Sequence, residues 1–155
     1  MQKGVESAAD VLNTFIDAEL SRLQLPADRL ALVGFSQGTM MSLHVGLKRP
    51  VKPAAIIGYS GMLARGTEME RLPADTPPIL LIHGDADAMI PPDAMFATAG
   101  MLGHAGACVQ WHIAPGVGHG IDPVGLAMGG GFLSMALRQQ LRRRIPEVNC
   151  TLSVN

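Results

Sequence analysis

The sequence has little charge, few aromatic side chains and almost no cysteine. Only 16% of its 155 residues are charged, against about 25% in an average soluble domain, and 4% are aromatic. Twelve basic and thirteen acidic residues leave a net charge of −1, which excludes the basic surface typical of nucleic-acid binding. The apolar share of 48% excludes an intrinsically disordered chain, which combines low hydrophobicity with high net charge.

Targeting and disulfide signals are also missing. The first seven residues contain no apolar signal-peptide segment, and no uninterrupted apolar run reaches the roughly 18 residues that a membrane span needs. Two cysteines, Cys108 and Cys150, are too few for a disulfide framework. We therefore expect a cytoplasmic protein with reduced thiols rather than a single bridge, and no transmembrane helix.

Short apolar runs alternate with helical patterns along the chain. Apolar residues at steps of three and four predict an amphipathic helix over 5–23, which should end before Pro26. The runs that follow show little alternation, as in strands buried on both faces, and this order favours an α/β fold with a mostly parallel sheet. The predicted strands are 29–35, 54–59, 78–83 and 107–113, and the later predicted helices are 36–48, 92–103 and one within 122–144.

The C-terminal part carries two further expectations. Gly129-Gly130-Gly131 should interrupt the last helix or delay its start, because each glycine costs about 1 kcal/mol of helix stability. The chain should form one domain over 1–145, followed by a polar tail over 146–155 that frays.

Gly34-Phe35-Ser36-Gln37-Gly38 fits the pattern G-x-S-x-G between a predicted strand and a predicted helix. In this motif the serine occupies a sharp turn, and small residues two positions on either side let the strand and helix approach closely. The backbone N–H of Gln37, at the helix N-terminus, would act as an oxyanion donor. Taken alone, the pattern also fits a glycine-rich turn in which Ser36 caps the helix.

Two later segments supply the partners that a nucleophilic serine needs. Asp85 and Asp87 follow the third predicted strand; we expect Asp85 to bind loop backbone and Asp87, further into the loop, to be functional. His119 lies among small residues after the fourth predicted strand. The order Ser36, Asp87, His119 is that of α/β-hydrolases, and all three positions follow strand ends, where ligands bind in open α/β sheets.

The remaining candidates have weaker signals. We expect His83, at a strand end, to support the aspartate loop. The other histidines are predicted to be structural: His44 on a helix, His104 near a helix end and His112 within a strand. Apolar residues bordering the strand ends either contact the acyl group of a substrate or pack in the core, and these are Met62, Leu63, Met89 and Ile90.

Three segments together resemble the phospholipase/carboxylesterase family of α/β-hydrolases, which includes the acyl-protein thioesterases. They are Gly34–Met40, His83–Asp87 with Ile90-Pro91, and Gly116–Ile121, within a resemblance that covers about residues 5–140. The resemblance implies hydrolysis of carboxylic esters, or thioesters, without a metal or organic cofactor. It assigns the nucleophile to Ser36, the acid to Asp87 and the base to His119.

The resemblance also implies what this sequence lacks. The family begins with further strands and helices, and a His-Gly loop there supplies a second oxyanion N–H; nothing here matches it, so we expect an N-terminally truncated fold. The strand at 29–35 would then be an exposed apolar edge, which favours self-association, for instance as a homodimer. Loss of one oxyanion donor lowers kcat by about 10²–10³. A second hypothesis is therefore a hydrolase with little or no activity that binds a partner, or a second copy of itself, at that edge.

A third hypothesis is a metal site built from His83, Asp85, Asp87 and His119, whose side chains suit zinc. Under this hypothesis the serine motif would be a coincidence. We therefore favour the hypothesis of a hydrolase whose ligand is a small-molecule ester. Dinucleotide binding is excluded, because no G-x-G-x-x-G follows the first strand.

Overall fold

The computed structural model describes residues 2–64 and 71–138, with side chains from residue 5 onward. Cys150 and the predicted tail over 146–155 lie outside the described residues. The helices and strands are α1 (Gln2–Leu23), a 3-10 turn (Ala27–Arg29), β1 (Ala31–Phe35), α2 (Gln37–Lys48), β2 (Ala55–Tyr59), β3 (Ile79–Gly84), α3 (Pro92–His104), β4 (Val109–Ala114) and α4 (Pro123–Leu137).

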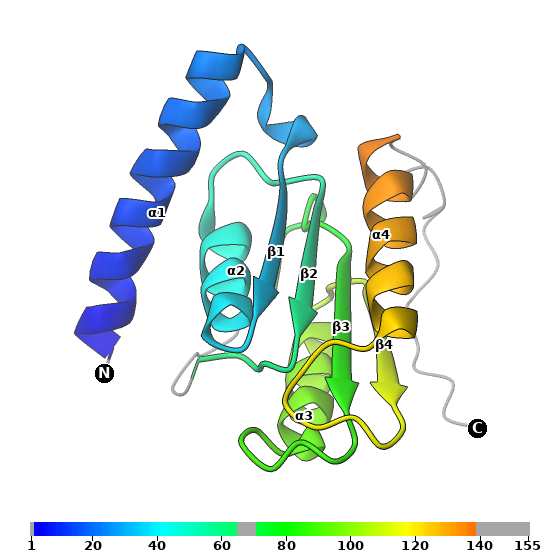
Figure 1. Cartoon of the computed structure of the whole chain (residues 1–155). Helices are drawn as coiled ribbons and strands as arrows, with labels where there is room; N and C mark the ends of the chain where they lie inside the picture. Colours follow the sequence, from blue (N-terminus) through cyan, green and yellow to red (C-terminus); the bar gives the residue numbers. More distant parts are fainter. Residues whose placement is uncertain (1, 65–70, 139–155) are drawn as a thin grey trace.

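The four strands form one parallel sheet in the order β1-β2-β3-β4, which confirms the predicted α/β class. In Figure 1 all four arrowheads point the same way, so the loops that follow the strands gather at one edge of the sheet. Every residue of β2 and β3 is buried. This explains why their sequences are apolar without alternation.

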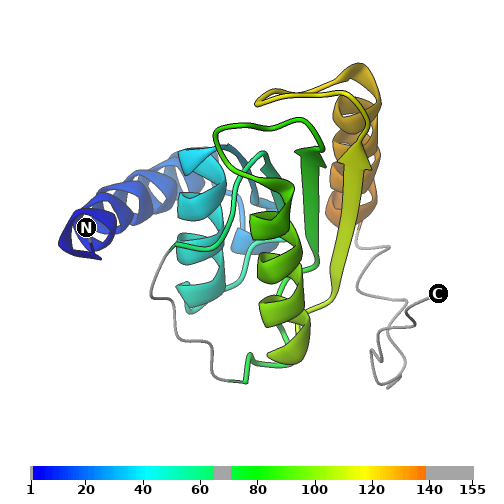
Figure 2. The ribbon, with the colours of Figure 1, turned by 90° about the horizontal axis from the view of Figure 1, so that it is seen from below.

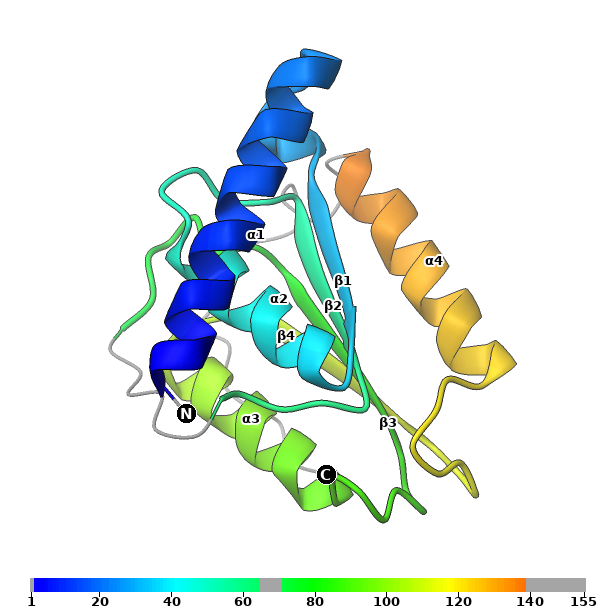
Figure 3. The same cartoon turned by 60° about the vertical axis from the view of Figure 1, so that its left-hand side comes forward.

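Helices cover both faces of the sheet. Figure 2 shows α2 and α3 on one face and α4 on the other. Figure 3 shows α1 crossing α2 near the β1 edge of the sheet, where its Ala9 and Ile16 form a core cluster with Leu32 of β1 and Val45 of α2. The α2–α3 face is filled by a core cluster that includes Leu43, Leu81 and Met95, and the α4 face by one that includes Tyr59 and Phe132. Among the described residues, no helix combines the length and apolar character that crossing a bilayer demands.

The strand β1 lies at an edge of the sheet and is less covered than its neighbours. Its Val33 and Phe35 are in register with Ile57 and Tyr59 of β2, so they point to the face on which α4 packs. The helix α4 packs mainly on β2, β3 and β4. Val33 and Phe35 are therefore 54% and 41% exposed, and the expected apolar edge strand is present in the described structure.

The three glycines of α4 do not break the helix, so the expected interruption or late start is wrong. The helix begins at Pro123, where the Asp122 carboxylate accepts the N–H groups of Val124 (3.1 Å) and Gly125 (3.0 Å). At Gly129 a side-chain Cβ would lie only 1.8 Å from the Tyr59 hydroxyl oxygen. Glycine is thus needed there for close packing on the sheet, and that burial offsets its low helix propensity.

Candidate active site

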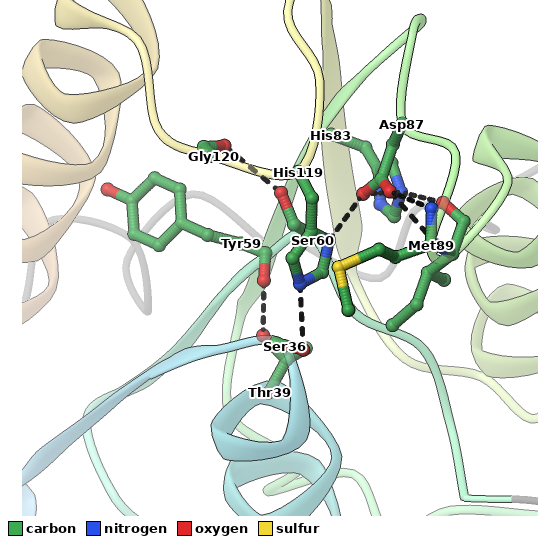
Figure 4. Close-up of polar contacts among 10 residues, drawn as sticks. Ser36, Thr39, Tyr59, Ser60, His83, Asp87, Met89, His119 and Gly120 are labelled. Carbon is green, nitrogen blue, oxygen red and sulfur yellow. Dashed lines mark hydrogen bonds and ion pairs between the residues drawn. The ribbon is translucent and has the colours of Figure 1, made fainter.

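The three residues of the predicted hydrolase set lie at the same edge of the sheet. Ser36 directly follows β1, Asp87 lies in the loop after β3, and His119 lies in the loop after β4. Because the strands are parallel, their carboxyl ends coincide, and Figure 4 shows the three side chains turned toward one another.

A continuous hydrogen-bond chain connects these side chains. Ser36 Oγ lies 3.0 Å from His119 Nε2, and His119 Nδ1 lies 2.8 Å from Asp87 Oδ2. An ionised Asp87 only accepts, so His119 Nδ1 carries the proton and Nε2 is left as the acceptor of the Ser36 hydroxyl. The imidazole is therefore oriented to take a proton from the serine.

The turn at Ser36 is strained and tightly held. Ser36 has φ 55° and ψ −117°, a backbone conformation that residues with a side chain rarely adopt and that costs roughly 1–3 kcal/mol. Its N–H donates to the Tyr59 carbonyl of β2 at 2.9 Å. The buried Thr39 hydroxyl lies 2.8 Å from that carbonyl and 2.9 Å from the Gly34 carbonyl, between which it shares its one proton.

Of the two motif glycines, only Gly34 is required by space. A Cβ at Gly34 would lie 2.2 Å from the carbonyl oxygen of Gly38, so the strand and helix touch backbone to backbone there. A Cβ at Gly38 would meet nothing within 4 Å. Gln37 is the first residue of α2, so its N–H has no carbonyl acceptor one turn earlier in the helix. An N–H that is free in this way can donate to an oxyanion.

The Asp87 carboxylate is buried and held by several donors. Its Oδ1 accepts the backbone N–H of Met89 (2.9 Å) and of Ile90 (3.0 Å), while Oδ2 accepts from His119. Burial raises the pKa of Asp87, but the N–H of Ile90, the His119 ring and the N–H of Met89 together outweigh it, so the pKa lies below the ordinary value. The carboxylate is therefore ionised at neutral pH and stabilises a protonated His119.

The aspartate and histidine loops are bonded to each other. Asp85 Oδ1 accepts the N–H of Gly116 at 2.6 Å, and the N–H of Ala86 donates to the Val117 carbonyl at 3.0 Å. Asp85 thus binds loop backbone, as expected from the sequence. A Cβ at Gly84 would lie 2.0 Å from the Val117 oxygen, so the two loops are also in direct contact.

Sequence reasoning missed three residues around the site. Ser60, at the end of β2, is buried with φ 46°, and its hydroxyl donates to the carbonyl of Gly120, next to His119, at 3.0 Å. Thr39 holds the serine turn, and the Phe35 ring centroid lies 4.9 Å from that of His119. Two signals were present in the sequence: Ser60-Gly61 after an apolar run, and a threonine directly after the motif. Each is also typical of an ordinary turn or helix, so neither indicates a role in the site.

The four apolar candidates separate into different environments. Leu63 is 8% exposed and belongs to the core cluster on the α2–α3 face, whereas Met89 is 73% exposed. Met62 and Ile90 are half-buried. The backbone N–H of Met89 donates to the Asp87 carboxylate, which places this residue at the site, and in the view of Figure 4 its thioether extends toward the His119 ring.

Within residues 2–64 and 71–138, no group of three or more His, Cys, Asp or Glu side chains is arranged to hold a metal ion. Asp85 is turned to the Gly116 N–H instead. The remaining histidines lie where the sequence predicts them, His44 in α2, His104 at the end of α3 and His112 in β4.

The chain is similar to several known proteins. The sequence pattern of the phospholipase/carboxylesterase family matches residues 1–137. Acyl-protein thioesterase 1 of Schizosaccharomyces pombe is 37% identical over 105 residues, which are 65% of this chain and 46% of that protein. Acyl-protein thioesterase 1 of Gibberella zeae is 30% identical over 140 residues, which are 87% of this chain and 59% of that protein.

Solved structures agree with these sequence matches. The crystal structure of esterase PE8 has a TM-score of 0.80 and 36% identity, covering 86% of this chain and 62% of that chain. The carboxylesterase of Bacillus cereus has a TM-score of 0.76 at 15% identity, covering 87% of this chain and 63% of that chain, and shows a likeness of fold. The chain thus spans between 46% and 63% of the length of these four proteins.

Proposed function

Since this chain belongs to the phospholipase/carboxylesterase family, we propose that it is a serine hydrolase that cleaves carboxylic esters or thioesters through an acyl-Ser36 intermediate. The observation that carries the proposal is the continuous hydrogen-bond chain from Ser36 Oγ through His119 to Asp87 Oδ2. Strain at Ser36 adds support, because residues in such conformations cluster at active sites.

In the proposed reaction, Ser36 Oγ attacks the carbonyl carbon of the ester while His119 Nε2 takes the hydroxyl proton. Asp87 holds the Nδ1–H tautomer and stabilises the imidazolium that forms. The N–H of Gln37 donates to the developing oxyanion. His119 then returns the proton to the leaving alcohol or thiol. A water molecule next attacks the acyl carbon while His119 takes its proton, and His119 passes that proton to Ser36 Oγ as the bond to the acid breaks.

The surface beside Ser36 favours an apolar acyl group. Met89 and Phe35 are exposed at 73% and 41%, and the half-buried Ile90 follows Met89. The half-buried Met62 follows Gly61, at which a Cβ would lie 2.7 Å from the Ser36 carbonyl oxygen. Leu63, which packs in the core, would act through packing and not by touching substrate. We therefore assign the acyl side to Met89, Ile90 and Met62.

A fluorophosphonate probe tests the nucleophile directly, because it reacts with an activated serine hydroxyl. The unaltered chain should be labelled and should hydrolyse p-nitrophenyl esters, whereas Ser36→Ala should lose both. Ser134→Ala, on the exposed side of α4, is the matched control and should behave like the unaltered chain. Labelling that persists in Ser36→Ala would show that Ser36 is not the nucleophile.

A second candidate function is assembly through β1 without turnover. It is favoured by one observation, that the edge strand exposes Val33 and Phe35. In that case the folded chain would show no labelling, and it would self-associate, for instance as a homodimer, in sedimentation experiments. Val33→Lys should then dissociate the assembly; a monomeric, labelled protein would exclude this candidate.

A further inference from the structure

The buried His83 has contacts that the proposed reaction does not use. Its side chain and that of Asp87 are both fully buried, and His83 Nε2 lies 3.2 Å from Asp87 Oδ2. The same nitrogen lies 2.8 Å from the carbonyl oxygen of Ile90. His83 Nδ1 is buried and has no hydrogen-bond partner in the structure.

These contacts determine which ring nitrogen carries the proton. The carbonyl of Ile90 can only accept, so the hydrogen bond of 2.8 Å requires a proton on His83 Nε2. That N–H also lies within reach of Asp87 Oδ2, the oxygen to which His119 donates. Two imidazoles from different elements, β3 and the loop after β4, thus meet at one carboxylate oxygen (Figure 4).

We propose that His83 is a positioning residue of the site. Its single Nε2–H, shared between the Ile90 carbonyl and Asp87 Oδ2, fixes the loop after β3 against the end of that strand and limits the negative charge that Asp87 presents to His119. This deepens the proposed function and rests on it. Oδ1 already accepts from Met89 and Ile90, so His83 is the one side-chain donor other than His119 for which the described structure gives a contact with this carboxylate.

The proposal has a consequence at His119. The titratable groups that face Asp87 are His83, from the end of β3, and His119, from the loop after β4; His119 in turn faces Asp87, Ser36 and the uncharged ring of Phe35. Without the donor of His83, Oδ2 carries more negative charge toward His119. The imidazolium is then stabilised further, so a smaller share of His119 is a free base at a given pH.

Two substitutions separate the donor from the shape of the side chain. His83→Gln places an amide N–H the same number of bonds from Cβ as Nε2, whereas His83→Met has a similar length and cannot donate. We expect His83→Gln to retain kcat/KM for p-nitrophenyl butyrate within about threefold. His83→Met should lower the plateau of kcat/KM about tenfold or more and move its acid limb up by about half a pH unit or more.

The titration of His119, followed by NMR of its ring signals, gives a readout that does not require turnover. It should move to higher pH in His83→Met and stay unchanged in His83→Gln. If the two variants have the same His119 titration and the same plateau while thermal melting shows both folded, His83 is merely structural and the proposal is wrong. Should His83→Met not fold, His83→Asn, whose amide is too short to reach the Nε2 position, takes its place with the same expectation.

The failure of this proposal differs from that of the proposed function. Persistent probe labelling in Ser36→Ala, or none in the unaltered chain, would contradict the hydrolase. The titration of His119 in the two His83 variants would still report whether His83 acts through Asp87.

Discussion

The strands β1 and β3 each carry part of the candidate site, yet they hold it by different means. β3 has a neighbour on both sides and all six of its residues are buried, whereas β1 is an edge strand with Val33 and Phe35 exposed. The loop after β3 is tied by side-chain and backbone bonds to the loop after β4. The turn after β1 depends on a backbone contact at Gly34 and on one carbonyl of β2, that of Tyr59.

This difference shows how the two parts respond to damage. The acid is held by several donors, so replacing one group should alter the chemistry more than the fold. The nucleophile is held by a strained turn whose backbone is in close contact at Gly34, so a small steric change should disturb its conformation. The following substitutions test that contrast.

The largest expected effect is at the acid. Asp87→Asn should lower kcat by about 10³–10⁴, because a neutral amide cannot fix the Nδ1–H tautomer of His119 or stabilise its protonated form. Thermal melting should show a folded protein. Asp85→Asn is the matched control: its amide oxygen can still accept the Gly116 N–H, so kcat should stay within about threefold. Equal losses in the two variants would contradict the assignment of the acid.

In the serine turn, residues 34–39, a substitution should lower the stability of the fold as well as the activity. Gly34→Ala brings a Cβ to 2.2 Å from the Gly38 carbonyl, and we expect a loss of about 3 kcal/mol or more in the free energy of unfolding, together with loss of probe labelling. Gly38→Ala should be neutral or stabilising by up to about 1 kcal/mol, since it meets no atom within 4 Å. Denaturant titration measures both; a stable Gly34→Ala would mean that the turn is not packed as described.

The helix α4 sharpens the comparison, because it packs on Tyr59, whose carbonyl holds Ser36. Gly129→Ala would overpack the Tyr59 hydroxyl and should cost about 1–3 kcal/mol in the free energy of unfolding. Gly131→Ala meets nothing within 4 Å and should stabilise the helix by up to about 1 kcal/mol. Tyr59→Phe should relieve part of the cost of Gly129→Ala, and its failure to do so would exclude Tyr59 as the obstructing group.

The smallest effect should be the dependence of stability on acid pH. The pKa of Asp87 is lowered in the folded chain from an ordinary value of 3.8, so its contribution to stability is present above that value and is lost as the pH falls through the folded pKa. The serine turn, residues 34–39, has no titratable side chain. Melting temperatures measured below about pH 4 should therefore fall less steeply for Asp87→Asn than for the unaltered chain. Parallel curves would contradict the assigned pKa direction.

Much of the fold could be predicted because its signals are local. The strand predicted over 78–83 is β3 at 79–84, and the helix predicted over 92–103 is α3 at 92–104. The first strand begins two residues later than predicted, because the preceding residues form a 3-10 turn over 27–29. Local periodicity reports the type of an element more reliably than its ends.

Other features depend on neighbours that are distant in the chain. Gly129 is needed by Tyr59, 70 positions earlier, so no local pattern could indicate that the glycines would stay helical. Ser60 holds the carbonyl of Gly120, a partner 60 residues away. Likewise, Leu63 and Met89 look alike in the sequence, and only packing separates a core residue from an exposed one.

The sequence by itself determined the order of strands and helices, the motif around Ser36 and the succession of Ser36, Asp87 and His119, because hydrophobic period and turn chemistry act over a few residues. Only the tertiary structure decided that Ser36 and His119, 83 positions apart, lie 3.0 Å from each other, and that His83 reaches the same carboxylate. Those distances depend on the register of four parallel strands and on backbone contacts between their loops, which no short stretch of sequence encodes.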